Sequence, residues 1–94
     1  MSLIFEWNEE KAKENLRKHK ISFEEAKTVF NDPFLITVPD PEHSESEQRY
    51  LNMGSSSKGQ ILIVIHAERG ANIRIVSCRK ATTKERKAYE EENF

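Results

Sequence analysis

Basic side chains and a histidine interrupt a stretch of the chain that otherwise has the composition of buried β-strands. Residues 61–80 read ILIVIHAERGANIRIVSCRK, and a turn around Gly70 separates two apolar runs. Arginine binds phosphate oxygens through its planar fork, and histidine exchanges a proton near neutral pH. The segment therefore has the side chains for anion binding and acid–base chemistry. The alternative is that these cations lie on an ordinary solvated face of a sheet.

Positive charge is concentrated in the second part of the chain, although the net charge is only −1. Residues 1–57 contain seven lysines and arginines against eleven acids, whereas residues 58–94 contain eight against five. Between Arg69 and Lys87 there are seven cations and one acid, Glu85. This local excess predicts a surface that contacts phosphate groups.

Strand periodicity predicts which of these side chains share a face. Alternation places the isoleucines of both runs on one face, which we expect to be the core, and places His66 and Arg74 on the other, open face. Matching the isoleucines across the turn sets Ile65 opposite Ile75 and His66 opposite Arg74. In this register Arg79 falls on the isoleucine face.

The remaining sequence predicts further strands and three helices. We expect strands over residues 3–7, 34–38 and 49–53, and helices over 9–19, over about eight residues from 22, and from 82 to about 92. Ser22 with Glu25 and Thr82 with Glu85 have the spacing of capping boxes. The acidic loop 42–47 is expected to be mobile. This order predicts a two-layer α+β domain with an antiparallel sheet of about four strands and its helices on the isoleucine face.

Length and composition narrow the classes of protein to consider. Ninety-four residues fit a single domain, 1–94, with one modest core. We find no apolar run long enough to span a membrane and no secretory signal pattern, so a cytoplasmic location is expected. The single Cys78 cannot form an internal disulfide, and it is expected to be a small buried residue. The scattered histidines make a structural zinc site improbable.

Three motifs in this order resemble the BrnT family of type II toxin–antitoxin systems. They are FEWNEEKAKENLRKHKISFEEAKTVFNDP at 5–33, TVPDPEHSESEQRYLNMG at 37–54 and HAERGANIRIVSCRKATTKERKAYE at 66–90. The resemblance implies a RelE-like fold, a ribonuclease that arrests translation by cutting RNA, and neutralisation by a BrnA-type antitoxin. It implies neither a metal nor an organic cofactor. The basic positions of the family fall on Arg49, Arg69, Arg74 and Arg79, and a histidine or aromatic position falls on His66.

The implied chemistry assigns roles to these residues. A metal-independent ribonuclease can use the 2′-hydroxyl of its substrate as nucleophile, so it needs a proton acceptor, stabilisation of the charged phosphorane and a proton donor. We expect Arg74 and Arg49 to bind and stabilise the phosphate. His66 is the expected general acid or base, and Glu68 is an alternative base. A histidine at a strand end can equally be a hydrogen-bonded structural residue.

The other candidates have structural alternatives of similar weight. Arg79 is expected either to act in catalysis or to pair with a carboxylate such as Glu6 or Glu85. We also consider four residues as contacts for RNA, with solvation or packing as the alternative for each: Arg69, Lys80, Lys18 and Trp7.

Two other classes of function remain open from the sequence. In one, the domain is a non-catalytic module whose basic sheet face docks an acidic partner. In the other, which is weaker, the chain binds DNA directly, although no helix-turn-helix pattern is visible. Loss of cleavage without loss of partner binding in an Arg74→Ala variant would separate an enzyme from a docking module.

Overall fold

The computed structural model describes residues 3–41 and 47–94, so all of the predicted acidic loop except Glu47 lies outside the described residues. These described residues form four helical segments and five strands. In order they are β1 (Ile4–Glu6), α1 (Glu9–His19), α2 (Phe23–Ala26), the 3-10 helix η1 (Lys27–Asn31), β2 (Ile36–Pro39), β3 (Arg49–Ser55), β4 (Ile61–Arg69), β5 (Asn72–Lys80) and α3 (Thr83–Asn93). The α+β class is confirmed.

The strands form one mixed sheet in the order β1-β5-β4-β3-β2. β1 runs parallel to β5, whereas the other neighbours are antiparallel. The prediction of about four antiparallel strands was therefore wrong in number and in the direction of one edge strand. The reason is that β1 pairs with a partner far along the chain, Ile4 with Asn72, and alternation within a short strand does not reveal such a partner.

Side-chain caps fix where the helices begin. The Asn8 side chain accepts a hydrogen bond from the Lys11 amide at the start of α1 (3.0 Å), and Ser22 accepts one from the Glu25 amide at the start of α2 (3.0 Å). The predicted capping box at Ser22 is only half formed, because the Glu25 carboxylate instead accepts hydrogen bonds from Ser56 and Gln60 (2.7 Å each). The expected second helix consists of α2 and η1.

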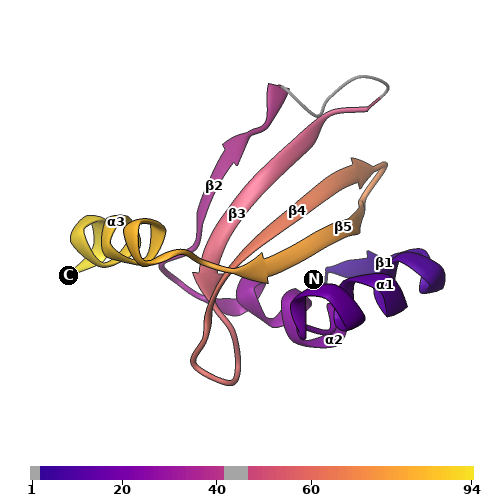
Figure 1. Ribbon diagram of the computed structural model, residues 1–94. Helices are drawn as coiled ribbons and strands as arrows, with labels where there is room; N and C mark the ends of the chain where they lie inside the picture. The colour runs from indigo at the N-terminus through magenta and orange to yellow at the C-terminus, as the bar shows by residue number, and fades with distance from the viewer. Residues whose placement is uncertain (1–2, 42–46) are drawn as a thin grey trace.

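The helices of the first half cover one face of the sheet, and α3 lies apart from them (Figure 1). The main core lies between these helices and β4 and β5. Its buried residues are Ile21, Phe23, Ala26, Val29, Leu62, Val64, Ile75 and Cys78. The helix-covered face is therefore that of Leu62 and Val64, so the prediction that the isoleucine face of β4 meets these helices was wrong.

A β-bulge in β5 changes the register of the central hairpin. Ile65 pairs with Ser77 and His66 pairs with Ile75, so Val76 is an additional residue of β5 with no counterpart in β4. An extra residue reverses the alternation of side chains beyond it. The predicted pair Ile65–Ile75 was wrong, because the turn already pairs Arg69 with Asn72, and this register sets Ile75 opposite His66.

The same bulge decides which face each arginine of β5 occupies. Arg74 pairs with Ala67, not with His66, and Arg79 pairs with Ile63. Without a bulge, residues 74 and 79 would point to opposite faces, because their spacing is odd. With it, both lie on the face that α1 and α2 do not cover.

α3 packs against part of that second face. Its Tyr89 is buried against Met53 and Ile63, and the Tyr89 hydroxyl donates to the Asp32 carboxylate. The same carboxylate accepts the Ser55 amide (2.7 Å). Burial would raise the pKa of Asp32, but the hydrogen bonds that it accepts lower it below the ordinary value. Asp32 thus joins η1, β3 and α3.

Gly54 provides a test of this junction. A Cβ at this position would lie 2.9 Å from Leu35 Cδ1 and 3.3 Å from Asp32 Oδ2. We expect Gly54→Ala to lower the free energy of unfolding by about 1–3 kcal/mol, as overpacking of a core does. Urea denaturation followed by circular dichroism measures this loss.

A matched control comes from the neighbouring turn, where Ser57 is exposed. Ser57→Ala should change the free energy of unfolding by less than about 0.5 kcal/mol, the usual range for surface substitutions. Equal stability of the two variants would contradict the close packing described for Gly54.

Candidate active site

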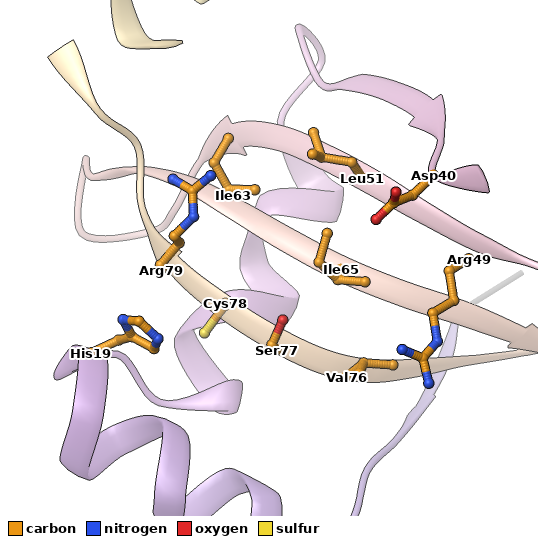
Figure 2. Close-up of a pocket in the computed structure, with 10 residues that line it drawn as sticks. All are labelled: His19, Asp40, Arg49, Leu51, Ile63, Ile65, Val76, Ser77, Cys78 and Arg79. Atoms are coloured by element: carbon orange, nitrogen blue, oxygen red, sulfur yellow. The ribbon is translucent and has the colours of Figure 1, made fainter. Parts of the chain in front are cut away.

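A cavity of about 460 Å³ opens on the sheet face that α2 and η1 leave uncovered. Its residues come from α1, from the segment after β2, and from β3, β4 and β5 (Figure 2). Aliphatic side chains contribute an apolar floor, and polar groups stand around it. The lining residues are His19, Asp40, Arg49, Leu51, Ile63, Ile65, Val76, Ser77, Cys78 and Arg79.

Arg79 stands at one end of the cavity and is held by a carboxylate of α3. Its two terminal nitrogens donate to the two oxygens of Glu85 at 2.7 and 2.9 Å. Glu85 also completes a capping box with Thr82 at the start of α3. The Arg79 guanidinium lowers the pKa of Glu85 to about 2. The predicted pairing of Arg79 with Glu85 is confirmed, and it fixes the guanidinium at the cavity.

Arg49 lies at the opposite end of the cavity floor (Figure 2). Its guanidinium is 3.8 Å from the Glu47 carboxylate. Asp40 is tied to the same place, because its amide donates to the Arg49 carbonyl (2.9 Å). One end of the cavity therefore carries an arginine beside carboxylates, as the other does.

Arg74 and Arg69 extend the basic surface beyond the cavity. Arg49 and Arg74 both pair with Ala67, so the two arginines lie in one row on the same face of the sheet. Within the described residues, no carboxylate lies within 4.0 Å of the Arg74 guanidinium. Arg69 Nε is 4.0 Å from Glu6 and 3.7 Å from Glu47. All four predicted arginines thus share one face, although Arg74 and Arg69 do not line the cavity.

His66 lies on the other face, away from these arginines. Only 4% of it is exposed, and its ring stacks on Tyr50 (centroids 5.1 Å apart) and meets Phe30 edge-on (5.4 Å). Asn52 Nδ2 is 2.6 Å from His66 Nδ1. Burial lowers the pKa of His66. The predicted placement of His66 opposite Arg74 was wrong, because Arg74 pairs with Ala67 and because the helices cover the face of β4 that His66 shares with Leu62 and Val64.

The remaining candidates do not join the cavity. Glu68, Lys80 and Lys18 are exposed, and none of them lines it. Trp7 packs edge-to-face on Phe23 (5.9 Å), and its indole nitrogen donates to Glu9 (3.0 Å). These observations fit the structural alternative for Trp7, and the lysines remain predicted contacts for RNA.

His19 is the residue of this site that the sequence reasoning missed. It ends α1, and it lines the cavity together with Arg79 and Ser77. α1 reaches this position because the Asn15 side chain bonds the amide and sulfur of Cys78 (3.1 Å each). Periodicity carries no signal for a contact between segments so far apart.

Cys78 itself is a structural residue, as expected. It is 2% exposed, and burial raises the pKa of its thiol to about 12. A thiol that keeps its proton is a poor nucleophile. Among the described residues there is no group of three or more side chains suited to hold a metal ion, and no helix there is long and apolar enough to cross a membrane.

The chain is a small α+β domain that carries its arginines on the sheet face where the cavity opens. The family described as "Ribonuclease toxin, BrnT, of type II toxin-antitoxin system" matches residues 7–85. The chain belongs to this family. Its fold is similar to the crystal structure of the Brucella abortus ribonuclease toxin BrnT, with a TM-score of 0.68 and 20% sequence identity over 87% of this chain and 100% of that chain. No curated protein sequence matches the chain significantly.

The buried His66 should make the fold sensitive to mild acid. Because its pKa is lower in the folded than in the unfolded chain, the unfolded chain binds more protons once the pH falls below about 6.5. We therefore expect stability to fall from pH 7.5 to pH 5.5, and to fall less in His66→Phe. Urea denaturation of both proteins across this range measures the difference. Equal pH dependence of the two would contradict a buried, neutral His66.

Proposed function

We propose that this chain is a metal-independent endoribonuclease that cuts RNA over the cavity face of the sheet and thereby inhibits translation. The observation that carries the proposal is that Arg49 and Arg79 stand at the two ends of a cavity with an apolar floor, and that Arg74 lies on the same face of the sheet. A phosphodiester is an anion flanked by apolar ribose and base surfaces, and this surface matches both parts. Family membership gives the class of reaction.

The reaction needs positive charge where the phosphorane forms. The 2′-oxygen of the ribose attacks phosphorus, the bond from phosphorus to the 5′-oxygen breaks, and negative charge accumulates on the non-bridging oxygens during the step. Fixed donors aimed at that charge lower the barrier more than mobile ones. Arg79 and Arg49 are proposed to bind these oxygens, and Arg74 the neighbouring phosphate of the strand.

Arg79 can bind a phosphate without releasing Glu85. A guanidinium has five N–H groups, and in Arg79 two bond Glu85 while a third contact reaches the Lys80 carbonyl (3.3 Å). The other N–H groups remain for an oxyanion. The side chain of Arg79 is 40% exposed, so a phosphate can reach it from the cavity.

The proposed partner is a BrnA-type antitoxin, and the proposed place of action is the cytoplasm. Arg69 and Arg74 supply an exposed or half-exposed basic surface beyond the cavity, and an acidic antitoxin segment bound there would exclude RNA by charge and by volume. No observation favours the non-catalytic docking module over the ribonuclease.

Cleavage of purified RNA in excess EDTA tests the proposed reaction. The wild-type chain should cut total RNA, or messenger RNA on added ribosomes, and Arg49→Ala should cut at about 10²–10³-fold lower rate, because one stabilising donor is lost. Arg17→Ala is the matched control. Arg17 lies on α1 away from the cavity and pairs with Glu14, so its removal should leave the rate unchanged.

Two results would refute the proposal. In one, the wild-type chain stops cutting RNA in EDTA and cuts it again when a divalent ion is added, which would show that the reaction requires a metal. The other is a loss of antitoxin binding in Arg49→Ala, measured by titration calorimetry with the co-purified antitoxin, that parallels its loss of toxicity. This result would indicate a docking module.

A further inference from the structure

We propose that His19 is the general acid of this site and gives its proton to the 5′-oxygen that leaves when the RNA strand is cut. The inference rests on the proposed ribonuclease function. It is carried by the position of His19 in the cavity beside Arg79, and by the chemistry of the other groups that line the same cavity.

The end of α1 holds His19 in a defined place. Lys20, the next residue, adopts a left-handed conformation (φ 63°), and its amide donates to the Leu16 carbonyl (2.9 Å). One turn earlier, Asn15 is fixed to Cys78 of β5 through its side chain. Figure 2 shows His19 at the same end of the cavity as Arg79. A phosphate bound by Arg79 would therefore have the imidazole beside it.

The other lining side chains cannot serve as the acid. Arginines keep their protons in proteins, which excludes Arg49 and Arg79. The Cys78 thiol, with its pKa of about 12, is 2% exposed, and Asp40 offers a carboxylate, which accepts protons. The hydroxyl of Ser77 is a far weaker acid than an imidazolium. Among the described residues that line the cavity, only His19 is of a type that both gives and accepts a proton near neutral pH.

The proton inventory of the step balances with His19 in this role. The 2′-hydroxyl loses its proton to a base as its oxygen attacks phosphorus, and a 2′,3′-cyclic phosphate forms. The electron pair of the breaking bond stays on the 5′-oxygen, which takes the proton from the His19 imidazolium and leaves as a hydroxyl. Neutral His19 then recovers a proton from water, and no oxidant or reductant takes part.

A sulfur-substituted substrate tests this role directly. We would compare an RNA carrying the bond that wild type cuts with the same RNA in which sulfur replaces the bridging 5′-oxygen at that bond. A thiolate leaves without being protonated, because a thiol is a much stronger acid than an alcohol. His19→Gln should cut the ordinary RNA about 10²–10⁴-fold more slowly than wild type, and should cut the sulfur-containing RNA at nearly the wild-type rate.

The controls separate this inference from the proposed function. Arg49→Ala should be slow on both substrates, and Arg17→Ala should be normal on both. Thermal unfolding of His19→Gln should match wild type, because His19 is exposed. A second variant, His19→Ala, should show the same rescue by sulfur.

Four outcomes would overturn the inference. If His19→Gln cuts the ordinary RNA normally, or is equally slow on both substrates, His19 is not the acid, while the dependence on Arg49 leaves the ribonuclease function standing. If wild type cuts neither RNA, or Arg49→Ala cuts both at the wild-type rate, the proposed function fails and the inference fails with it.

Discussion

One additional residue in β5 determines where the charged groups of this protein lie. Val76 has no partner in β4, and this bulge reverses the alternation between the two halves of the strand. Because of it, Ile75 and Cys78 both lie in the core under the helices, and Arg74 and Arg79 both lie on the opposite face. A regular hairpin of the same sequence would divide the arginines between the two faces and place one of them in the apolar core, which is strongly unfavourable for an unpaired cation.

Neighbouring carboxylates restrict the long arginine side chains of the site. Carboxylates from α3, from β1 and from the segment before β3 lie beside three of the arginines, at Glu85, Glu6 and Glu47. These pairs are partly exposed, so each adds little to the stability of the fold. Their larger effect is on orientation, since the two-pronged contact between Arg79 and Glu85 restricts a long side chain before any substrate arrives. The carboxylates allow several arginines to lie close together on one face of the sheet. They also reduce the positive potential of that face.

Local signals in the sequence predicted the local structure well. The caps at Asn8 and Thr82 located α1 and α3. The alternation of side chains along the strand also indicated Glu85 as a possible partner of Arg79. The wrong predictions arose where a contact with a segment far along the chain determines the structure. Short-range periodicity does not reveal the parallel pairing of β1 with β5, and it does not reveal the docking of α1 that brings His19 to the cavity. A bulge without glycine also has no distinctive residue type by which it could be predicted.

The long-range pairing of β1 has a consequence for how the molecule is made. Ile4 of β1 meets Asn72 of β5, and Asn15 of α1 meets Cys78, so β1 and α1 must wait for the synthesis of β5 before they find their partners. Contacts of such sequence separation form late, because the loop between them must close first. During translation the cavity is therefore incomplete until β5 has emerged.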